Sequence, residues 1–235
     1  MKNRNEIFLI TGTRKGLGQS LALHYLQTGK IVIGCSRNNA SIEHKNYTHF
    51  KLDVSDEKEV QKMIRVISKR HKKVDVLINN AGIALMNHVL LTAKSSVNDI
   101  FNTNFLGTFL FIREASRLMI KNKYGRIVNF STVAVPLNLE GEAIYASSKS
   151  AVETFTRVSS KELGQFGITV NAIGPSPVLT DLIRLVPKEK IDSLIESQAI
   201  KRFGETEDIL NVVDFFINEK SDFITGQTIY LGGIS

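Results

Sequence analysis

Short apolar runs alternate with longer amphipathic stretches along the whole sequence of 235 residues. Such alternation is typical of βαβ units, in which buried strands are joined by helices that cover the sheet. The runs that we expect to form strands are 6–11, 30–35, 50–54, 74–79, 125–131, 168–173 and 228–231. The pattern therefore predicts a doubly wound, mainly parallel sheet of about seven strands with helices on both faces, a Rossmann-type α/β fold.

The stretches between these runs place apolar residues at helical spacing. We expect helices at 17–27, 56–71, 92–120, 143–163 and 209–217. An irregular segment that contains three prolines runs from Pro175 to about Arg202, and we expect it to form loop and short helices. Because no Gly/Ser-rich linker, repeat or low-complexity tract divides the chain, residues 1–235 are predicted to form a single domain.

Composition excludes several classes of protein. The chain has 43% hydrophobic residues, an ordinary content for a globular protein. Cys35 is the only cysteine, and no Cys/His cluster has the spacing of metal ligands, so we expect neither a disulfide nor a metal site. No stretch is long and apolar enough for a signal peptide or a membrane span, so we expect a cytoplasmic protein without a membrane partner.

The chain is basic, with 30 Lys and Arg against 23 Asp and Glu and a net charge of +7, which favours anionic ligands. Nucleic-acid binding would need a clustered basic stripe or a reading motif. The basic runs 69–73 and 113–126 are more simply interpreted as solvated helix faces and helix ends. We therefore expect no nucleic-acid partner.

A glycine-rich turn connects the first predicted strand to the first predicted helix. It reads Thr11-Gly12-Thr13-Arg14-Lys15-Gly16-Leu17-Gly18, so its glycines follow the pattern Gly-x-x-x-Gly-x-Gly. Glycines at this junction let the backbone come close to a pyrophosphate at the helix N-terminus. A plain tight turn is the alternative, but the position at the first strand-to-helix junction favours a nucleotide-phosphate site.

Several further motifs follow in order: Asn79-Asn80-Ala81-Gly82, Asn104, Tyr145-x-x-x-Lys149, Asn171-Ala172-Ile173-Gly174-Pro175 and Thr225-Gly226-Gln227. With them the chain resembles the short-chain dehydrogenase/reductase family over essentially its whole length. The style of the motifs is closest to that of the 3-oxoacyl-[acyl-carrier-protein] reductase-like members. The resemblance implies a homotetramer or homodimer that interconverts a carbonyl and a secondary alcohol, with an acyl thioester among its candidate small-molecule substrates.

The charges around the expected ribose site favour NADP(H) over NAD(H). Sites that prefer NAD usually offer a carboxylate at the end of the second strand, where this chain has Ser36. Arg37 follows Ser36, and the glycine turn contributes Arg14 and Lys15. These cations can neutralise the added 2′-phosphate. The alternative, in which they are solvated surface charges, leaves their convergence on one expected site unexplained.

The resemblance also implies which residues hold the cofactor. It assigns Asp53 and Val54 to the adenine edge, Asn80 to the adenosine ribose and Val178 to the carboxamide. A helix-capping or loop role is the alternative for Asp53. The predicted set is Gly12, Thr13, Arg14, Lys15, Gly16, Leu17, Gly18, Arg37, Asp53, Val54, Asn80, Ala81, Gly82, Tyr145, Lys149, Pro175, Val178 and Thr180.

Tyr145 and Lys149 are four residues apart on a predicted helix and therefore share one face. A nearby ammonium and the positive nicotinamide of the oxidised cofactor favour the phenolate of a tyrosine. The resemblance implies that Tyr145 exchanges a proton with the substrate oxygen while Lys149 holds the ribose hydroxyls. It also implies that Asn104 interrupts a helix and binds a water that links Lys149 to solvent.

Two departures from the family pattern bear on activity. The serine that family members place thirteen residues before the tyrosine is Thr132 here, which keeps the hydroxyl but adds a methyl group. The neighbouring Ser131 is the alternative if the register shifts by one residue. Ser176 and Pro177 replace a more flexible sequence beside the nicotinamide, ahead of an expected substrate lid at about 180–202. The alternative function is a regulatory protein that binds NADP but is catalytically impaired.

Overall fold

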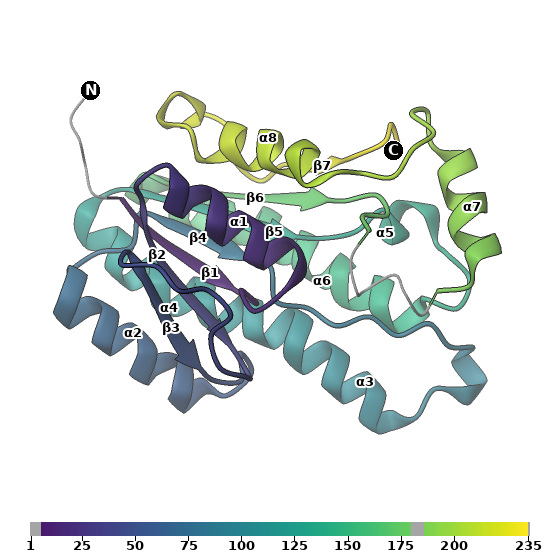
Figure 1. The fold of residues 1–235 in the computed structure, drawn as a ribbon, viewed down its shortest axis with the longest axis horizontal. Coiled ribbons are helices and arrows are strands. Elements are labelled where there is room, and N and C mark those ends of the chain that lie inside the picture. Colours follow the sequence, from purple (N-terminus) through teal and green to yellow (C-terminus); the bar gives the residue numbers. More distant parts are fainter. Residues whose placement is uncertain (1–5, 180–185, 235) are drawn as a thin grey trace.

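The computed structural model describes residues 6–179 and 186–234. Its seven strands form one sheet (Figure 1). The strands are β1 (Ile7–Thr11), β2 (Ile31–Ser36), β3 (Tyr47–Lys51), β4 (Val76–Asn79), β5 (Gly125–Phe130), β6 (Ile168–Gly174) and β7 (Thr228–Tyr230). They lie in the order β3-β2-β1-β4-β5-β6-β7, and every neighbouring pair is parallel. This order confirms the predicted doubly wound, Rossmann-type sheet.

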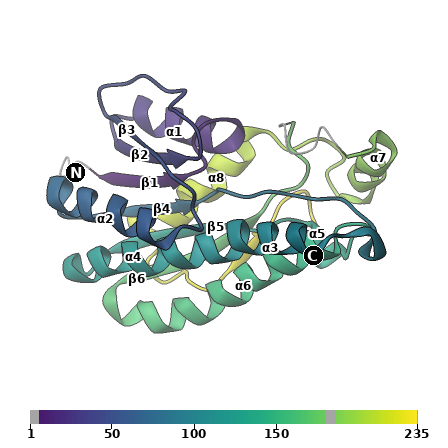
Figure 2. The same cartoon turned by 90° about the horizontal axis from the view of Figure 1, so that it is seen from below.

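Helices cover both faces of the sheet (Figures 1 and 2). One face carries α1 (Gly16–Gln27) and α8 (Thr206–Ile217), and the other carries α2 (Glu57–His71), α4 (Gly107–Asn122) and α6 (Ala143–Leu163). Successive residues of β1 alternate between two hydrophobic cores: Ile7 and Leu9 pack with α2 and α4, whereas Phe8 and Ile10 pack with α1 and α8. Burial on both faces explains why the strands read as continuous apolar runs.

The third strand begins three residues earlier than the predicted 50–54, because β3 spans Tyr47–Lys51. Leu52 and Val54 are buried, but they lie beyond the end of the strand and pack in the core shared with α2 and α4. The apolar signal in the sequence therefore came from the turn into α2. The strand itself lies at the edge of the sheet and is only half-buried, which weakens its pattern.

The predicted helix at 92–120 is divided. α3 (Lys94–Phe101) and α4 are joined by a π-helical turn at Asn102–Leu106, so the helix is interrupted at Asn104 as expected. Such turns occur mostly at functional sites. The described part of the irregular segment contains the helix α7 (Lys188–Ser197), and a short helix α5 (Ala134–Leu137) follows β5. Within residues 6–179 and 186–234, no helix combines the length and the hydropathy needed to cross a bilayer.

Candidate active site

The carboxyl ends of the central strands open into one cavity of about 540 Å³, a volume within the usual range for small-molecule sites. In a sheet of this kind, ligands bind where the strand order reverses, which is between β1 and β4 here. The predicted site residues that line the cavity include Asn80, Thr132, Tyr145, Lys149, Pro175 and Val178. The tertiary structure thus brings together residues that lie almost 100 positions apart in the chain, from Asn80 to Val178.

The glycine turn leaves no room for side chains at its closest approach. Gly12 and Gly16 have φ values of +75° and +59°, a conformation that L side chains rarely adopt. A Cβ atom at Gly18 would lie 2.3 Å from both the Gly12 carbonyl oxygen and Asn80 Nδ2. α1 begins at Gly16, within this turn, and the N–H groups at the start of a helix have no partner inside the helix. The first-turn N–H groups therefore suit an anion.

Hydrogen bonds hold the glycine turn against the end of β4. Asn80 Nδ2 donates to the carbonyl oxygens of Thr11 and Gly12, at 3.0 and 3.3 Å. The Ala81 backbone N–H donates to Thr11 Oγ1 at 2.9 Å. The side chain predicted to contact the adenosine ribose therefore also fixes the turn. The hydroxyl of Thr11 has a structural role that the sequence motif alone did not assign.

The cations expected to bind a 2′-phosphate lie on two connected segments. Arg14, Lys15 and Arg37 are all exposed, as a phosphate at the protein surface requires. The backbone N–H groups of Gly12 and Thr13 both donate to the carbonyl oxygen of Cys35, at 2.9 and 3.2 Å. These bonds bring the glycine turn beside the end of β2, as predicted.

The residues predicted at the adenine edge have clear structural partners. Asp53 Oδ1 accepts hydrogen bonds from the backbone N–H and the hydroxyl of Ser55, at 2.9 and 2.7 Å, and Asp56 caps α2. This geometry matches the loop role considered as the alternative for Asp53. The Val54 side chain packs against the start of α4: its Cγ2 would lie only 2.8 Å from a Cβ atom placed on Gly107. Contact of either residue with adenine stays a prediction.

The two candidate hydroxyls of the catalytic group point to different partners. Ser131 Oγ donates to the buried carboxylate of Glu153, which also accepts a hydrogen bond from Tyr230 Oη at 2.7 Å. Thr132 Oγ1 instead accepts from the Ala134 N–H at 3.2 Å, and the Thr132 side chain is the neighbour that lowers the pKa of Tyr145. The geometry therefore favours Thr132 over Ser131 as the hydroxyl beside the tyrosine.

Burial shifts the acid–base properties of Tyr145 and Lys149 in opposite directions. Burial raises the pKa of Tyr145 to about 12, the charge of Glu142 also raises it, and the hydrogen bond from Thr132 opposes both. Burial lowers the pKa of Lys149 to about 8, and its ammonium donates to the Phe130 carbonyl oxygen at 2.8 Å. At neutral pH the tyrosine hydroxyl therefore keeps the proton that carbonyl reduction requires.

Asn104 joins the loop after β4 to the catalytic helix α6. Its amide donates to the Ile83 carbonyl oxygen and accepts from the Ile83 N–H, both at 2.9 Å. It also donates to Ser148 Oγ at 3.0 Å, and this hydroxyl donates to the Tyr145 carbonyl oxygen at 2.7 Å. A Cβ at Gly82 would lie 3.3 Å from both Asn104 Oδ1 and Lys149 Nζ, so the small residue lets these groups approach. The water expected at Asn104 stays a prediction.

The segment after β6 is held by the chain before α8. Val178 forms a parallel bridge with Gly204, whose N–H donates to the Pro177 carbonyl oxygen at 2.8 Å. Ser176 is buried beside Gly204 and is not among the described residues with positive φ, so serine replaces glycine here without backbone strain. Thr180 and the first part of the expected lid, through residue 185, lie outside the described residues.

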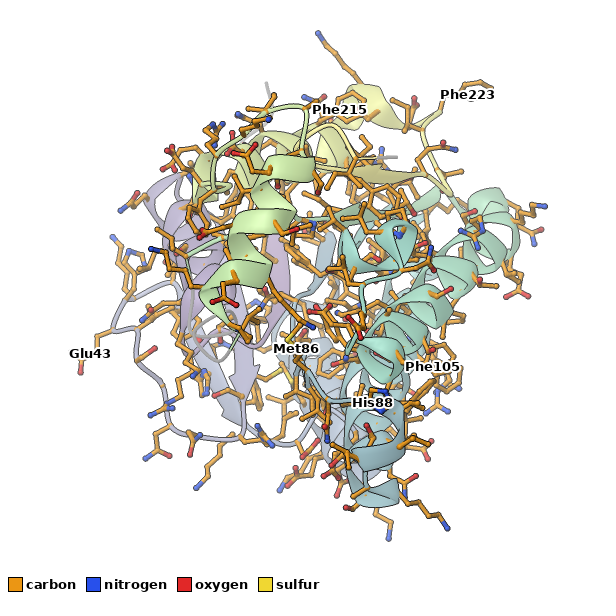
Figure 3. The ribbon with its side chains drawn as sticks, turned by 90° about the vertical axis from the view of Figure 1, so that its right-hand side faces the viewer. Glu43, Met86, His88, Phe105, Phe215 and Phe223 are labelled. Carbon is orange, nitrogen blue, oxygen red and sulfur yellow. The ribbon has the colours of Figure 1, made fainter. Side chains whose placement is uncertain are left out.

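The side of the cavity away from the glycine turn is mostly apolar, with charged groups at its edge. Its apolar lining includes Met86, Val133, Leu137, Leu139, Ile191 and Leu194. Met86 lies between α7 and α6 (Figure 3). Glu142 and Lys190 also line this side; burial raises the pKa of Glu142, and the charge of Lys190 lowers it. The sequence analysis did not select Glu142. Its position one helical turn before Tyr145 was the signal that could have identified it.

The part of the chain that the structure describes holds no cluster of metal-ligating side chains. A glycine turn that can cradle a pyrophosphate and a buried tyrosine–lysine pair beside one cavity define an oxidoreductase that uses a nicotinamide cofactor.

Comparisons with known proteins identify the family. Residues 12–234 match the family model described as Enoyl-(Acyl carrier protein) reductase. The chain is 32% identical to the 3-oxoacyl-[acyl-carrier-protein] reductase FabG of Staphylococcus epidermidis, over 97% of this chain and 98% of that relative. The chain belongs to the short-chain dehydrogenase/reductase family, and it is an oxidoreductase that acts on CH–OH or C=O groups.

Solved structures agree with this assignment. ElxO with NADP bound has a TM-score of 0.88 and 31% identity, and the match covers 97% of each chain. The 4-hydroxyisoleucine dehydrogenase complexed with NADH has a TM-score of 0.87 and 26% identity, over 98% of this chain and 99% of that chain. One of these structures has NADP bound and the other NADH, so structural similarity alone does not choose between the two cofactors.

Replacing Glu142 by Gln is expected to lower the pKa of Tyr145, because the substitution removes a negative charge that opposes formation of the phenolate. Tyrosinate absorbance measures this pKa when each protein is titrated against its own Tyr145→Phe counterpart. The Glu142→Gln midpoint should lie at lower pH than the wild-type midpoint. Glu140→Gln, on the exposed loop before α6, is the matched control. An unchanged Glu142→Gln midpoint would mean that burial alone sets the value.

Proposed function

We propose that this chain is an NADP-dependent carbonyl reductase in which Tyr145 gives the proton to the substrate oxygen. The observation that carries the proposal is the buried Tyr145 hydroxyl, beside Thr132 at a cavity that Lys149 also lines. Bound nicotinamide would supply the hydride. The dehydrogenase direction uses the same groups with the proton transfer reversed.

The cradle around the glycine turn supports cofactor binding. Its closest contact, at Gly18, has no space for a Cβ, which is the geometry that lets backbone approach a pyrophosphate. We assign the pyrophosphate to 12–18 and the adenosine to Asp53, Val54 and 80–82. The 2′-phosphate is assigned to Arg14, Lys15 and Arg37, and the nicotinamide end to Pro175, Val178 and Thr180, with Lys149 on its ribose.

Each catalytic side chain has a separate task. Thr132 donates a hydrogen bond to the carbonyl oxygen, which stabilises the negative charge that develops there. The Tyr145 O–H bond breaks as its proton forms the new O–H bond of the alcohol, leaving a phenolate. Lys149 stabilises that phenolate by its positive charge. Asn104 is a positioning residue that holds α6 and the loop after β4 together.

The substrate is proposed to be a 3-oxoacyl thioester or a related ketone. Curated relatives named 3-oxoacyl-[acyl-carrier-protein] reductase support this class, and the apolar wall around Met86 suits an acyl chain. We propose that 186–202, the described part of the expected lid, which includes α7, covers this wall. We also propose that 1–235 works as a single domain; the cytoplasmic location stays a prediction from the sequence.

Replacing Tyr145 by Phe is expected to reduce NADPH-dependent turnover by roughly 10²- to 10⁴-fold, the usual contribution of a positioned general acid. The measurement is NADPH oxidation with acetoacetyl thioester, matched simple ketones and a 2-enoyl thioester. Tyr124→Phe, a tyrosine that does not line the cavity, should keep full activity.

Three results of this assay would contradict the proposal. Full turnover by the Tyr145→Phe variant would remove the tyrosine from the mechanism. Reduction of the enoyl thioester alone would mean that the reaction class is wrong. Tight NADPH binding without turnover of any substrate would support the regulatory protein instead.

Replacing Arg37 by Asp is expected to lower the ratio of kcat/KM for NADPH to that for NADH. Loss of a charge-assisted hydrogen bond to the 2′-phosphate corresponds to roughly a tenfold or greater change. Steady-state kinetics with both cofactors measure the ratio. Lys62→Asp makes the same charge change on the exposed surface of α2 and should leave it unaltered. An unchanged ratio in Arg37→Asp would mean that the phosphate is held elsewhere.

We also propose a homotetramer or homodimer built on α4 and α6. Half-buried aromatic rings join α6 to α4 and to the π-helical turn before it: Phe155 lies 5.9 Å from Phe105 in the turn and 5.8 Å from Phe109 in α4, measured between ring centroids. Such a group can seat a second copy of the chain. Light scattering after size-exclusion chromatography should give a multiple of 26.2 kDa, and Phe155→Arg should reduce it. A monomeric wild-type protein would contradict the proposal.

A further inference from the structure

A line of hydrogen bonds crosses the edge of the sheet next to the proposed 2′-phosphate site. Thr13 Oγ1 lies 2.7 Å from Tyr47 Oη, which lies 2.8 Å from His49 Nδ1. His49 Nε2 lies 3.1 Å from Ser36 Oγ and 3.0 Å from the Asn38 carbonyl oxygen. We call these side chains the Thr13–Tyr47–His49 relay. The relay connects the glycine turn, through β3, to the end of β2.

Strand β2 makes space for the relay by lacking one side chain. Gly34 pairs with His49 in the sheet and lies where the hydroxyls of Thr13 and Tyr47 meet. A Cβ at this position would lie 2.3 Å from each hydroxyl oxygen. Glycine inside a strand often marks such a close approach. Gly34 therefore permits the relay to cross β2.

The direction of the hydrogen bonds follows from which atoms can only accept. The Asn38 carbonyl can only accept, so His49 Nε2 must donate to it, and Nδ1 is left as the acceptor for Tyr47. Burial raises the pKa of Tyr47, so its hydroxyl keeps its proton and donates to Nδ1. Thr13, which is fully buried, then donates to Tyr47. Every polar atom of the relay has a partner, which gives it one defined arrangement.

The relay contacts the residues next to the proposed phosphate-binding cations. His49 reaches both Ser36 and Asn38, which flank Arg37 on either side. At its other end, Thr13 precedes Arg14 in the chain. One partly buried network therefore limits the backbone positions of both arginines. Fixing charged groups before a ligand arrives reduces the ordering that binding requires.

A second contact ties the same two segments together. Ser41 Oγ, in the loop after β2, donates to the Arg14 carbonyl oxygen at 2.6 Å and accepts from Gln19 Nε2 at 3.1 Å. The loop that carries Arg37 is thus attached to the glycine turn by Ser41 and to β3 by His49. The loop is therefore held from two sides, which gives it the rigidity that a phosphate site needs.

We propose that Tyr47 and His49 are positioning residues that determine cofactor specificity by holding Arg14 and Arg37 at the spacing a ribose 2′-phosphate requires. The inference rests on the proposed function, which assigns the 2′-phosphate to these arginines and Lys15. NADH lacks this phosphate. A displaced Arg37 therefore weakens NADPH binding and leaves NADH binding almost unchanged.

The test compares cofactors and cofactor fragments across single substitutions in the full chain. Tyr47→Phe removes one oxygen from the centre of the relay, and His49→Leu removes both ring nitrogens. His49→Gln keeps a donor and an acceptor and serves as the conservative rescue. Fluorescence titration gives the Kd of NADPH and NADH, and competition gives the Kd of adenosine 2′,5′-bisphosphate and AMP.

We expect Tyr47→Phe and His49→Leu to raise the Kd of NADPH and of adenosine 2′,5′-bisphosphate by roughly fivefold to tenfold, the effect of one lost hydrogen bond. The Kd values of NADH and AMP should change by less than about twofold, because neither ligand carries the 2′-phosphate. His49→Gln should recover most of the loss. Thr48→Val, on the opposite face of β3, is the matched control and should resemble the wild type.

Three results would overturn the inference, and they separate it from the proposed function. If the variants bind NADPH and NADH equally weakly relative to the wild type, the relay only supports the fold. If NADPH binding is unchanged, the relay does not position the arginines. Either result, in a wild type that prefers NADPH, leaves the proposed cofactor intact. A wild type that binds NADPH and NADH equally would contradict both proposals. If His49→Leu fails to fold, Tyr47→Phe still carries the test.

Discussion

The close approach of the glycine turn to the end of β4 is the contact on which the site depends. At Gly18 the backbone comes so near to Gly12 and Asn80 that no Cβ can be inserted. Asn80 then bonds the turn directly, and Thr11 bonds the chain after β4. This junction lies where the strand order reverses, so it creates the crevice and leaves the start of α1 open to an anion.

Burial gives the opposite side of the crevice its chemistry. The same loss of solvent raises the pKa of Tyr145 and lowers that of Lys149, so at neutral pH the tyrosine keeps its proton, and the lysine gives up its own at a lower pH than an exposed lysine would. Asn104 keeps the pair in place by binding Ile83 and Ser148 from the interrupted helix. The π-helical turn is thus part of the support of the catalytic helix.

Much of the fold was predictable because each strand buried on both faces is a continuous apolar run bounded by polar turns. The prediction was wrong where apolar residues are buried without pairing in a strand, and where strand residues pair without being fully buried. Leu52 and Val54 are apolar because they pack under α2 and α4, whereas Tyr47 pairs in β3 with only partial burial. The bounds of α7 were not predicted within the segment expected to form loop and short helices, because its mostly exposed residues carry a weak pattern.

The sequence by itself determined the alternation of strands and helices, the glycine turn and the tyrosine–lysine spacing, because these follow from local periodicity and motifs over a few residues. Only the tertiary structure decided how side chains from distant segments are directed. It turned Ser131 toward Glu153 and left Thr132 beside Tyr145. Hydrogen-bond direction depends on partners brought together by parallel strands, and no spacing along the chain encodes those partners.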